Sequence, residues 1–218
     1  MQSKLRRPAL LPYPVYECTP VHAERQQRIH HQLLQAHLPA AFSHCAFESL
    51  APHHSPEAHQ ICCAYAQTGH HQGKPGLLLI GPPGTGKTSL AVAILRRVVE
   101  RTDGEVGARF WNVPRGLEAL RSQPMGKRRS VLELFDHQLV VLDDVGKQLK
   151  TAWETEQLYT LIDGLWSEGK QVVLTTNLTP AALVQRLDMA VLSRILGMCT
   201  ALLVKGRDLR VGRIGPDL

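Results

Sequence analysis

One short segment restricts the possible folds of this chain more than any other feature. Residues 81–88 read GPPGTGKT and match the pattern G-x-x-x-x-G-K-[ST] of a phosphate-binding loop, or P-loop. An apolar run at residues 76–80 precedes the loop, and apolar residues at the helical period follow it. A strand that leads into such a loop, and a helix that follows it, form the context in which this pattern binds phosphate. A glycine-rich turn with a chance lysine would require neither neighbour.

The residue types in the loop suit a nucleoside triphosphate. Glycines let backbone N–H groups turn inward around phosphate oxygens, and the following helix adds the positive end of its dipole. We expect Lys87 to reach the β- and γ-phosphates and the Thr88 hydroxyl to bind Mg²⁺, so the expected cofactors are ATP and Mg²⁺. The expected nucleotide-binding residues are Gly81, Pro82, Pro83, Gly84, Thr85, Gly86, Lys87, Thr88 and Ser89.

Two later apolar runs also end in polar residues. Residues 139–142 read as a buried strand followed by Asp143, which would hold Mg²⁺ directly or through water, and Asp144, which would polarise the attacking water. Residues 172–175 read as another buried strand, and Asn177 beyond it could orient water against the γ-phosphate. Taken alone, such residues are also ordinary turn formers. Together they predict catalytic roles for Lys87, Asp144 and Asn177.

The remaining pattern predicts an α/β fold. Apolar strands that alternate with helices imply a parallel sheet covered on both faces, which gives a three-layer α/β/α arrangement of the P-loop NTPase type. We expect strands at residues 76–80, 108–113, 139–142, 172–175 and 200–204. We expect helices after the P-loop and at residues 115–122, 129–137 and 153–168.

The N-terminal part has a different composition. Ten of the eleven histidines lie at or before His71, and helices are expected over residues 22–38 and from Ser55, with Ser55 as the N-cap. Two histidines and four cysteines in this part could supply zinc ligands, but no C-x-x-C pair accompanies them. The alternative is a helical adaptor with buried cysteines. The residues concerned are Cys18, His22, His44, Cys45, Cys62 and Cys63.

Charge and composition restrict the kind of partner and the cellular location that we expect for this chain. The 218 residues carry a net charge of +6, which suits an anionic partner such as nucleic acid but does not require one. No apolar run approaches the ~20 residues that cross a bilayer, and the N-terminus lacks a signal-peptide core. Five scattered cysteines argue against a disulfide framework. We therefore expect a cytoplasmic protein that does not enter a membrane.

The motifs, in this order, resemble those of the AAA+ ATPases. More narrowly, they resemble the lid-less helicase loaders of the DnaC/DnaI type and the related IstB-type transposition proteins. The matching segments are GPPGTGKTSLA, LVVLDDVG, VVLTTNL, LSRI and GRDLR, within residues 40–213. The resemblance implies a sheet in the order 5-1-4-3-2. It also implies an ATPase core over residues 40–218 without a C-terminal lid, and a basic, histidine-rich helical adaptor segment over residues 1–39.

The resemblance also assigns roles to two arginines. Arg194, in LSRI, matches the arginine finger that reaches the γ-phosphate of a neighbouring subunit, so it implies a homo-oligomer and slow hydrolysis by a monomer. Arg210, in GRDLR, would contact the nucleotide or form a surface salt bridge. Two positions depart from the loader pattern. Leu165-Trp166 stands where loaders often have an arginine and an aromatic residue, and residues 189–191 lack a second arginine.

Three functions fit these motifs to different degrees. The first is a replicative helicase loader that binds the helicase and single-stranded DNA. The second is an IstB-like regulator of transposition on double-stranded DNA, although residues 175–177 read Thr-Thr-Asn, where IstB-type proteins commonly have Ser-Gln. The third, a small-molecule kinase, is disfavoured by the paired aspartates and the finger match. A basic cluster could track DNA phosphates or form a solvated turn, and comprises Arg115, Arg121, Lys127, Arg128 and Arg129.

Overall fold

A computed structural model describes residues 20–50, 55–123, 130–147, 151–206, 208 and 209 of the protein. Several residues singled out in the sequence lie outside these ranges. They are Cys18, Lys127, Arg128, Arg129 and Arg210.

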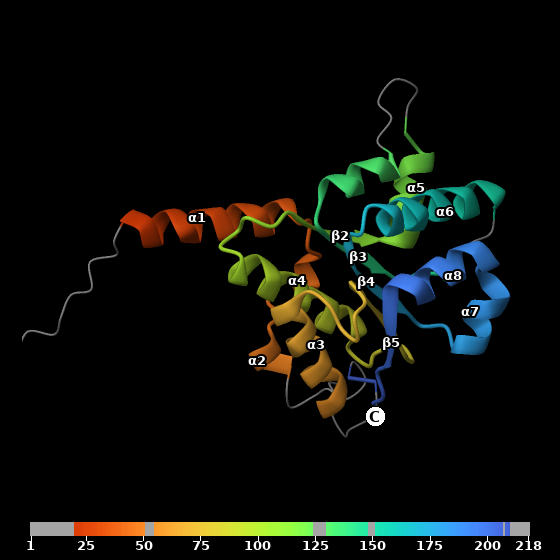
Figure 1. The fold of residues 1–218 in the computed structure, drawn as a ribbon, viewed down its shortest axis with the longest axis horizontal. Helices are drawn as coiled ribbons and strands as arrows, with labels where there is room; N and C mark the ends of the chain where they lie inside the picture. Colours follow the sequence, from red (N-terminus) through yellow and green to blue (C-terminus); the bar gives the residue numbers. More distant parts are fainter. Residues whose placement is uncertain (1–19, 51–54, 124–129, 148–150, 207, 210–218) are drawn as a thin grey trace, which may run out of the picture.

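The centre of the molecule is a five-stranded parallel sheet in the order β2-β3-β4-β1-β5 (Figure 1). This order confirms the predicted 5-1-4-3-2 arrangement, read from the other edge. In the register of the sheet, Leu78 of β1 lies opposite Leu174 of β4 and Ala201 of β5. The strands are β1 (Gly76–Ile80), β2 (Ala108–Asn112), β3 (Leu139–Asp143), β4 (Gln171–Thr176) and β5 (Cys199–Leu203).

Helices cover both faces of the sheet (Figure 1). Successive strand residues point to opposite faces, so Leu77 packs with one core and Leu78 with the other. The first core includes residues of α1 (Pro20–Gln35), α2 (Phe47–Leu50), α3 (Pro56–Thr68) and α4 (Lys87–Arg101). The second includes residues of α5 (Val113–Arg121), η3 (Val131–Asp136), α6 (Ala152–Ser167), α7 (Pro180–Arg186) and α8 (Met189–Met198). A short 3₁₀ helix, η1 (Ala40–Phe42), follows α1.

Local capping explains where the elements differ from expectation. The second strand was expected to reach residue 113 but ends at Asn112. The Asn112 side chain accepts a hydrogen bond from the Arg115 N–H and caps α5, which therefore begins at the next residue, Val113. The helix expected at 129–137 is instead a 3₁₀ helix that starts after Ser130, whose hydroxyl accepts from Leu132 N–H. Ser55 does precede a helix, although its side chain makes no capping hydrogen bond.

The C-terminal end of α1 lies beside the edge strand β2, where the Phe110 N–H donates to the carbonyl of Ala36, the residue after the helix, at 2.8 Å. Nearer the N-terminus of α1, Arg25 forms an ion pair at 2.7 Å with Asp103, in the turn between α4 and β2. The first turn of α1 extends away from the sheet (Figure 1). These contacts join residues of the predicted adaptor segment to the core, and the division at residue 39 stays a prediction.

The tight contact at Gly104 gives a test of this docking. Gly104 has φ +77°, and a Cβ there would lie 2.7 Å from the backbone carbon of Arg28. Gly104→Ala should therefore lower the free energy of unfolding by about 1–3 kcal/mol, measured by urea denaturation. Gly73→Ala is the matched control, because Gly73 has φ +74° with nothing within 4 Å of a built Cβ. Equal losses in both variants would show that α1 does not depend on this contact.

Candidate nucleotide-binding site

The P-loop connects β1 to α4 at the edge of the sheet where the parallel strands end. Gly84 and Gly86 adopt φ values of +79° and +87°, which only glycine adopts without strain, and Gly86 is the N-cap of α4. The N–H groups of the first helical turn, for which a helix supplies no acceptor of its own, thus open toward the loop. This is the local geometry of an anion site at a helix N-terminus.

Lys87 places a buried cation inside this loop. Its side chain is 5% exposed, and its ammonium group donates to the carbonyls of Gly81 at 2.8 Å and Pro82 at 2.7 Å. Thr85 closes the same loop, since its hydroxyl donates to Pro82 at 3.0 Å. The loop therefore combines oriented N–H groups with a lysine charge, as phosphate binding requires.

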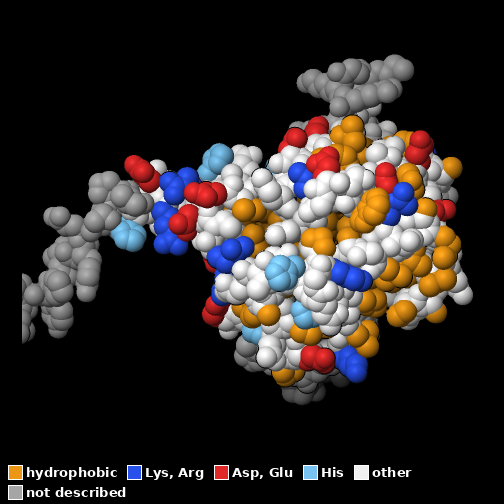
Figure 2. Space-filling model, in the orientation of Figure 1, with side chains coloured by type: hydrophobic (Ala, Val, Ile, Leu, Met, Phe, Trp, Pro, Cys, Tyr) orange, Lys and Arg blue, Asp and Glu red, His pale blue; other side chains and the backbone are white. Residues whose placement is uncertain are grey.

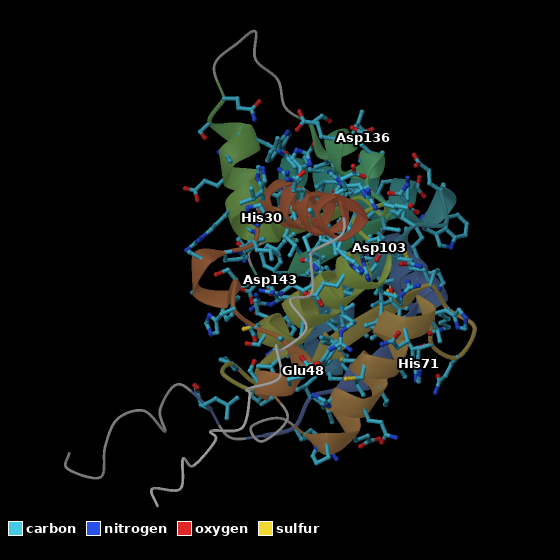
Figure 3. The ribbon with its side chains drawn as sticks, turned by 90° about the vertical axis from the view of Figure 1, so that its left-hand side faces the viewer. His30, Glu48, His71, Asp103, Asp136 and Asp143 are labelled. Atoms are coloured by element: carbon cyan, nitrogen blue, oxygen red, sulfur yellow. The ribbon has the colours of Figure 1, made fainter. Side chains whose placement is uncertain are left out.

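Asp143 is the point where the loop meets the sheet (labelled in Figure 3). It is 5% exposed, and its two carboxylate oxygens accept hydrogen bonds from side chains of three elements. The Thr88 and Thr175 hydroxyls both donate to Oδ1 at 2.8 Å, and Asn112 Nδ2 donates to Oδ2 at 3.0 Å. The structure thus brings together Thr88 and Asp143, the two predicted Mg²⁺ ligands.

Asp144 and Asn177, both predicted to act on the attacking water, also lie together. Asn177 Nδ2 donates to Asp144 Oδ1 at 2.6 Å, and Lys147 lies 3.4 Å from Oδ2. Asp144 adopts φ +62°, an uncommon conformation for a residue other than glycine, and its N–H donates to the Thr175 hydroxyl at 3.0 Å. The Asp144 side chain is partly exposed, unlike the buried Asp143.

The donor set suits Mg²⁺. Thr88 and Asp143 supply hard oxygen ligands, and Mg²⁺ in proteins takes one or two such ligands while water and substrate phosphates complete its shell.

The candidate zinc ligands that the structure describes do not form a metal site. Within the described ranges, no group of three or more His, Cys, Asp or Glu side chains could hold a metal ion. Among the candidate zinc ligands, Cys62 is buried in α3, and burial raises the pKa of its thiol to about 12, so the thiol keeps its proton at neutral pH.

The hydrogen bonds and ring contacts of Arg194 are made with α6 and α8, and none of them reaches the P-loop of its own chain. It lies on α8, forms an ion pair with Asp163 of α6, and donates to Tyr159 Oη at 3.1 Å. The segment after β5 does reach the loop, since Leu209 N–H donates to the Gly84 carbonyl at 3.1 Å. Arg210, the residue predicted there, lies outside the described ranges.

Sequence reasoning missed Asn112 and Thr175. Both stand at or next to the end of a strand, at the edge where Asp143 lies, and Asn112 is directly opposite Asp143 in the register. A search for polar residues at the ends of all the predicted strands would have found them. The signal was present, but Asn112 was placed within the expected strand 108–113 and Thr175 at the end of the buried strand 172–175, and neither was given a role.

Comparison with models of protein families shows to which family this chain belongs. Residues 19–213 match the family model described as IstB-like ATP binding protein. The chain belongs to this family. Its description as ATP-binding agrees with the P-loop geometry. An insertion-sequence ATP-binding protein of Sinorhizobium fredii is 29% identical over 156 residues, which cover 71% of this chain and 51% of that protein.

Solved structures show the same fold. The DnaC helicase loader is 25% identical with a TM-score of 0.65, covering 77% of this chain and 100% of that chain. DnaI has the same TM-score at 16% identity, covering 79% and 94% of the two chains. The predicted AAA+ resemblance is thereby confirmed.

The chain spans about half the length of the curated relatives it matches. No helix in the described ranges is long and apolar enough to cross a bilayer.

Thr175 gives the sharpest test of the hydrogen-bonded site. Thr175→Val keeps the shape but removes the hydroxyl that donates to Asp143 and accepts from Asp144 N–H. We expect a loss of about 1–3 kcal/mol in the free energy of unfolding, with a fall in ATP affinity. Thr175→Ser, which restores the hydroxyl, should recover both. Normal ATP affinity of Thr175→Val would show that the site does not depend on this network.

Proposed function

We propose that this protein binds ATP and Mg²⁺ at the P-loop, hydrolyses the nucleotide, and acts in the cytoplasm as a replicative helicase loader on single-stranded DNA. The observation that carries the proposal is the pair of linked contacts beside the loop. The Thr88 hydroxyl and Asp143 carboxylate meet at 2.8 Å, and Asp144 and Asn177 meet at 2.6 Å one residue further on. One pair suits metal binding and the other suits the handling of water.

Each side chain then has a distinct task. Lys87 and the loop N–H groups bind the phosphates, while Thr88 and Asp143 would hold Mg²⁺, which would offset the negative charge of the phosphates. Asp144 accepts a hydrogen bond from the attacking water and draws its proton away from the developing phosphate. Asn177 fixes the Asp144 carboxylate and orients the same water.

Two arginines complete the proposal. Arg194 acts as a finger toward the nucleotide of a neighbouring subunit, so full activity requires a homo-oligomer. Arg210 contacts the bound nucleotide, in keeping with the nearby contact of Leu209 with Gly84. Support for both roles comes from the family resemblance at LSRI and GRDLR.

The loader function is supported by similarity and by charge. The protein aligns with the whole of the DnaC helicase loader chain, and its fourth strand ends in Thr-Thr-Asn. Arg115 and Arg121 are exposed on α5, the helix between β2 and β3, where they can contact DNA phosphates. The N-terminal half of α1 would contact the replicative helicase.

A second candidate function rests on a different observation. The family description names IstB, and the Sinorhizobium relative comes from an insertion sequence. An ATPase that regulates transposition would bind double-stranded DNA and recruit a transposase. The core chemistry would be the same, so DNA preference separates the two functions.

The test is fluorescence anisotropy with labelled single- and double-stranded oligonucleotides. The protein is measured with ATP, with a non-hydrolysable analogue and without nucleotide, beside Lys87→Ala. We expect the wild type to bind single strands in a nucleotide-dependent way. Lys87→Ala should abolish this binding, because the Lys87 ammonium group anchors the phosphates. Nucleotide-dependent preference for the duplex would favour the transposition function. Binding to neither would contradict a DNA-directed role for α5.

A further inference from the structure

Arg194 is held on several sides by its own chain. Its Nε pairs with Asp163 Oδ1, its Nη1 donates to the Ala190 carbonyl at 3.2 Å, and its Nη2 donates to Tyr159 Oη at 3.1 Å. The guanidinium also lies over two aromatic rings, 5.0 Å from the centroid of Tyr159 and 5.6 Å from that of Trp166. Both its hydrogen-bonding edge and its flat face are therefore in contact with this subunit.

The partners are spaced so that one helix presents them together. Tyr159, Asp163 and Trp166 occupy positions i, i+4 and i+7 of α6, which place them along one stripe of the helix. The adjacent stripe of α6, with Leu161 and Leu165, is buried against the sheet. The carboxylate and the two rings of Tyr159, Asp163 and Trp166 thus form a clamp on α6 for the arginine on α8.

The clamp lies at the surface. The side chains of Arg194 and Asp163 are 25% and 36% exposed, and Trp166 is 49% exposed. Figure 2 shows further hydrophobic side chains over α7 and α8, where Val184, Met189 and Leu196 are exposed. A half-exposed ion pair is weak enough to exchange its carboxylate for another anion that approaches from outside.

We propose that Asp163 is a positioning residue that restrains Arg194 within its own subunit and thereby slows ATP hydrolysis. The proposal rests on the finger role of Arg194 given above. A guanidinium paired with a carboxylate has less charge to offer a phosphate, so Arg194 must leave Asp163 before it can stabilise the transition state in a neighbour. The aromatic rings keep the side chain extended while that exchange takes place.

The sign of the effect follows from this competition. Removal of the Asp163 charge lowers the free energy needed to release the arginine, so the rate rises wherever release limits hydrolysis. Loss of a purely structural ion pair would not raise activity. The expected gain is about two- to fivefold, the range that corresponds to an exposed or half-exposed ion pair.

The experiment is a double-mutant cycle on steady-state ATP hydrolysis by the full chain, over a range of protein concentrations. The variants are Asp163→Asn, Arg194→Ala and the combination of the two, with nucleotide affinity measured for each. We expect Asp163→Asn to raise kcat about two- to fivefold at unchanged nucleotide affinity. The gain should vanish in the Arg194→Ala background. Glu168→Gln is the matched control, because Glu168 forms a surface ion pair with Lys170 just beyond the end of α6.

The outcomes separate the two proposals. If Arg194→Ala hydrolyses ATP at the wild-type rate, the finger role fails and the restraint fails with it. If Arg194→Ala is slow but Asp163→Asn is no faster than wild type, only the restraint is overturned. A gain that persists without Arg194 would also overturn it. Should Asp163→Asn not fold, Tyr159→Phe removes one acceptor of the same guanidinium and must raise the rate in the same direction.

Discussion

The buried carboxylate of Asp143 is the interaction on which the rest of the site depends. A charge that is 5% exposed is costly to bury unless its oxygens are hydrogen-bonded. Thr88, Thr175 and Asn112 meet that need from three different elements. Because these donors belong to α4, β4 and the end of β2, satisfying one carboxylate also fixes the P-loop helix against two strands.

The two halves of the proposed chemistry differ in how they are held. The residues beside the loop are locked by short contacts within the edge of the sheet, so they need little rearrangement to act. Arg194 lies where α8 packs against α6, and its contacts are partly exposed and made within its own subunit. The residues proposed to bind the nucleotide therefore lie in one chain, whereas the proposed finger role of Arg194 would depend on assembly.

Sequence patterns predicted the P-loop, Thr88 and Asp143 as Mg²⁺ ligands, and separate roles for Asp144 and Asn177 toward the attacking water, whereas the resemblance to the AAA+ loaders implied the sheet order. The sequence determines the strands and the loop through periodicity and fixed motif spacing. It did not predict the hydrogen bonds of Asn112 and Thr175. Those bonds depend on which strands become neighbours and in what register, and periodicity within one strand does not contain that information. The pairing of Arg194 with Asp163 was missed for the same reason, since the two lie on different helices.

The proposed catalytic role of Asp144 is tested most directly by phosphate release by the full chain with and without Mg²⁺, compared between wild type and Asp144→Asn, with ATP affinity measured in parallel. We expect Mg²⁺-dependent release by the wild type. We expect Asp144→Asn to keep its ATP affinity but to release phosphate about a hundredfold more slowly, because the water loses its proton acceptor. Equal rates in the two proteins, or ATP binding by the wild type with no release at any protein concentration, would contradict it.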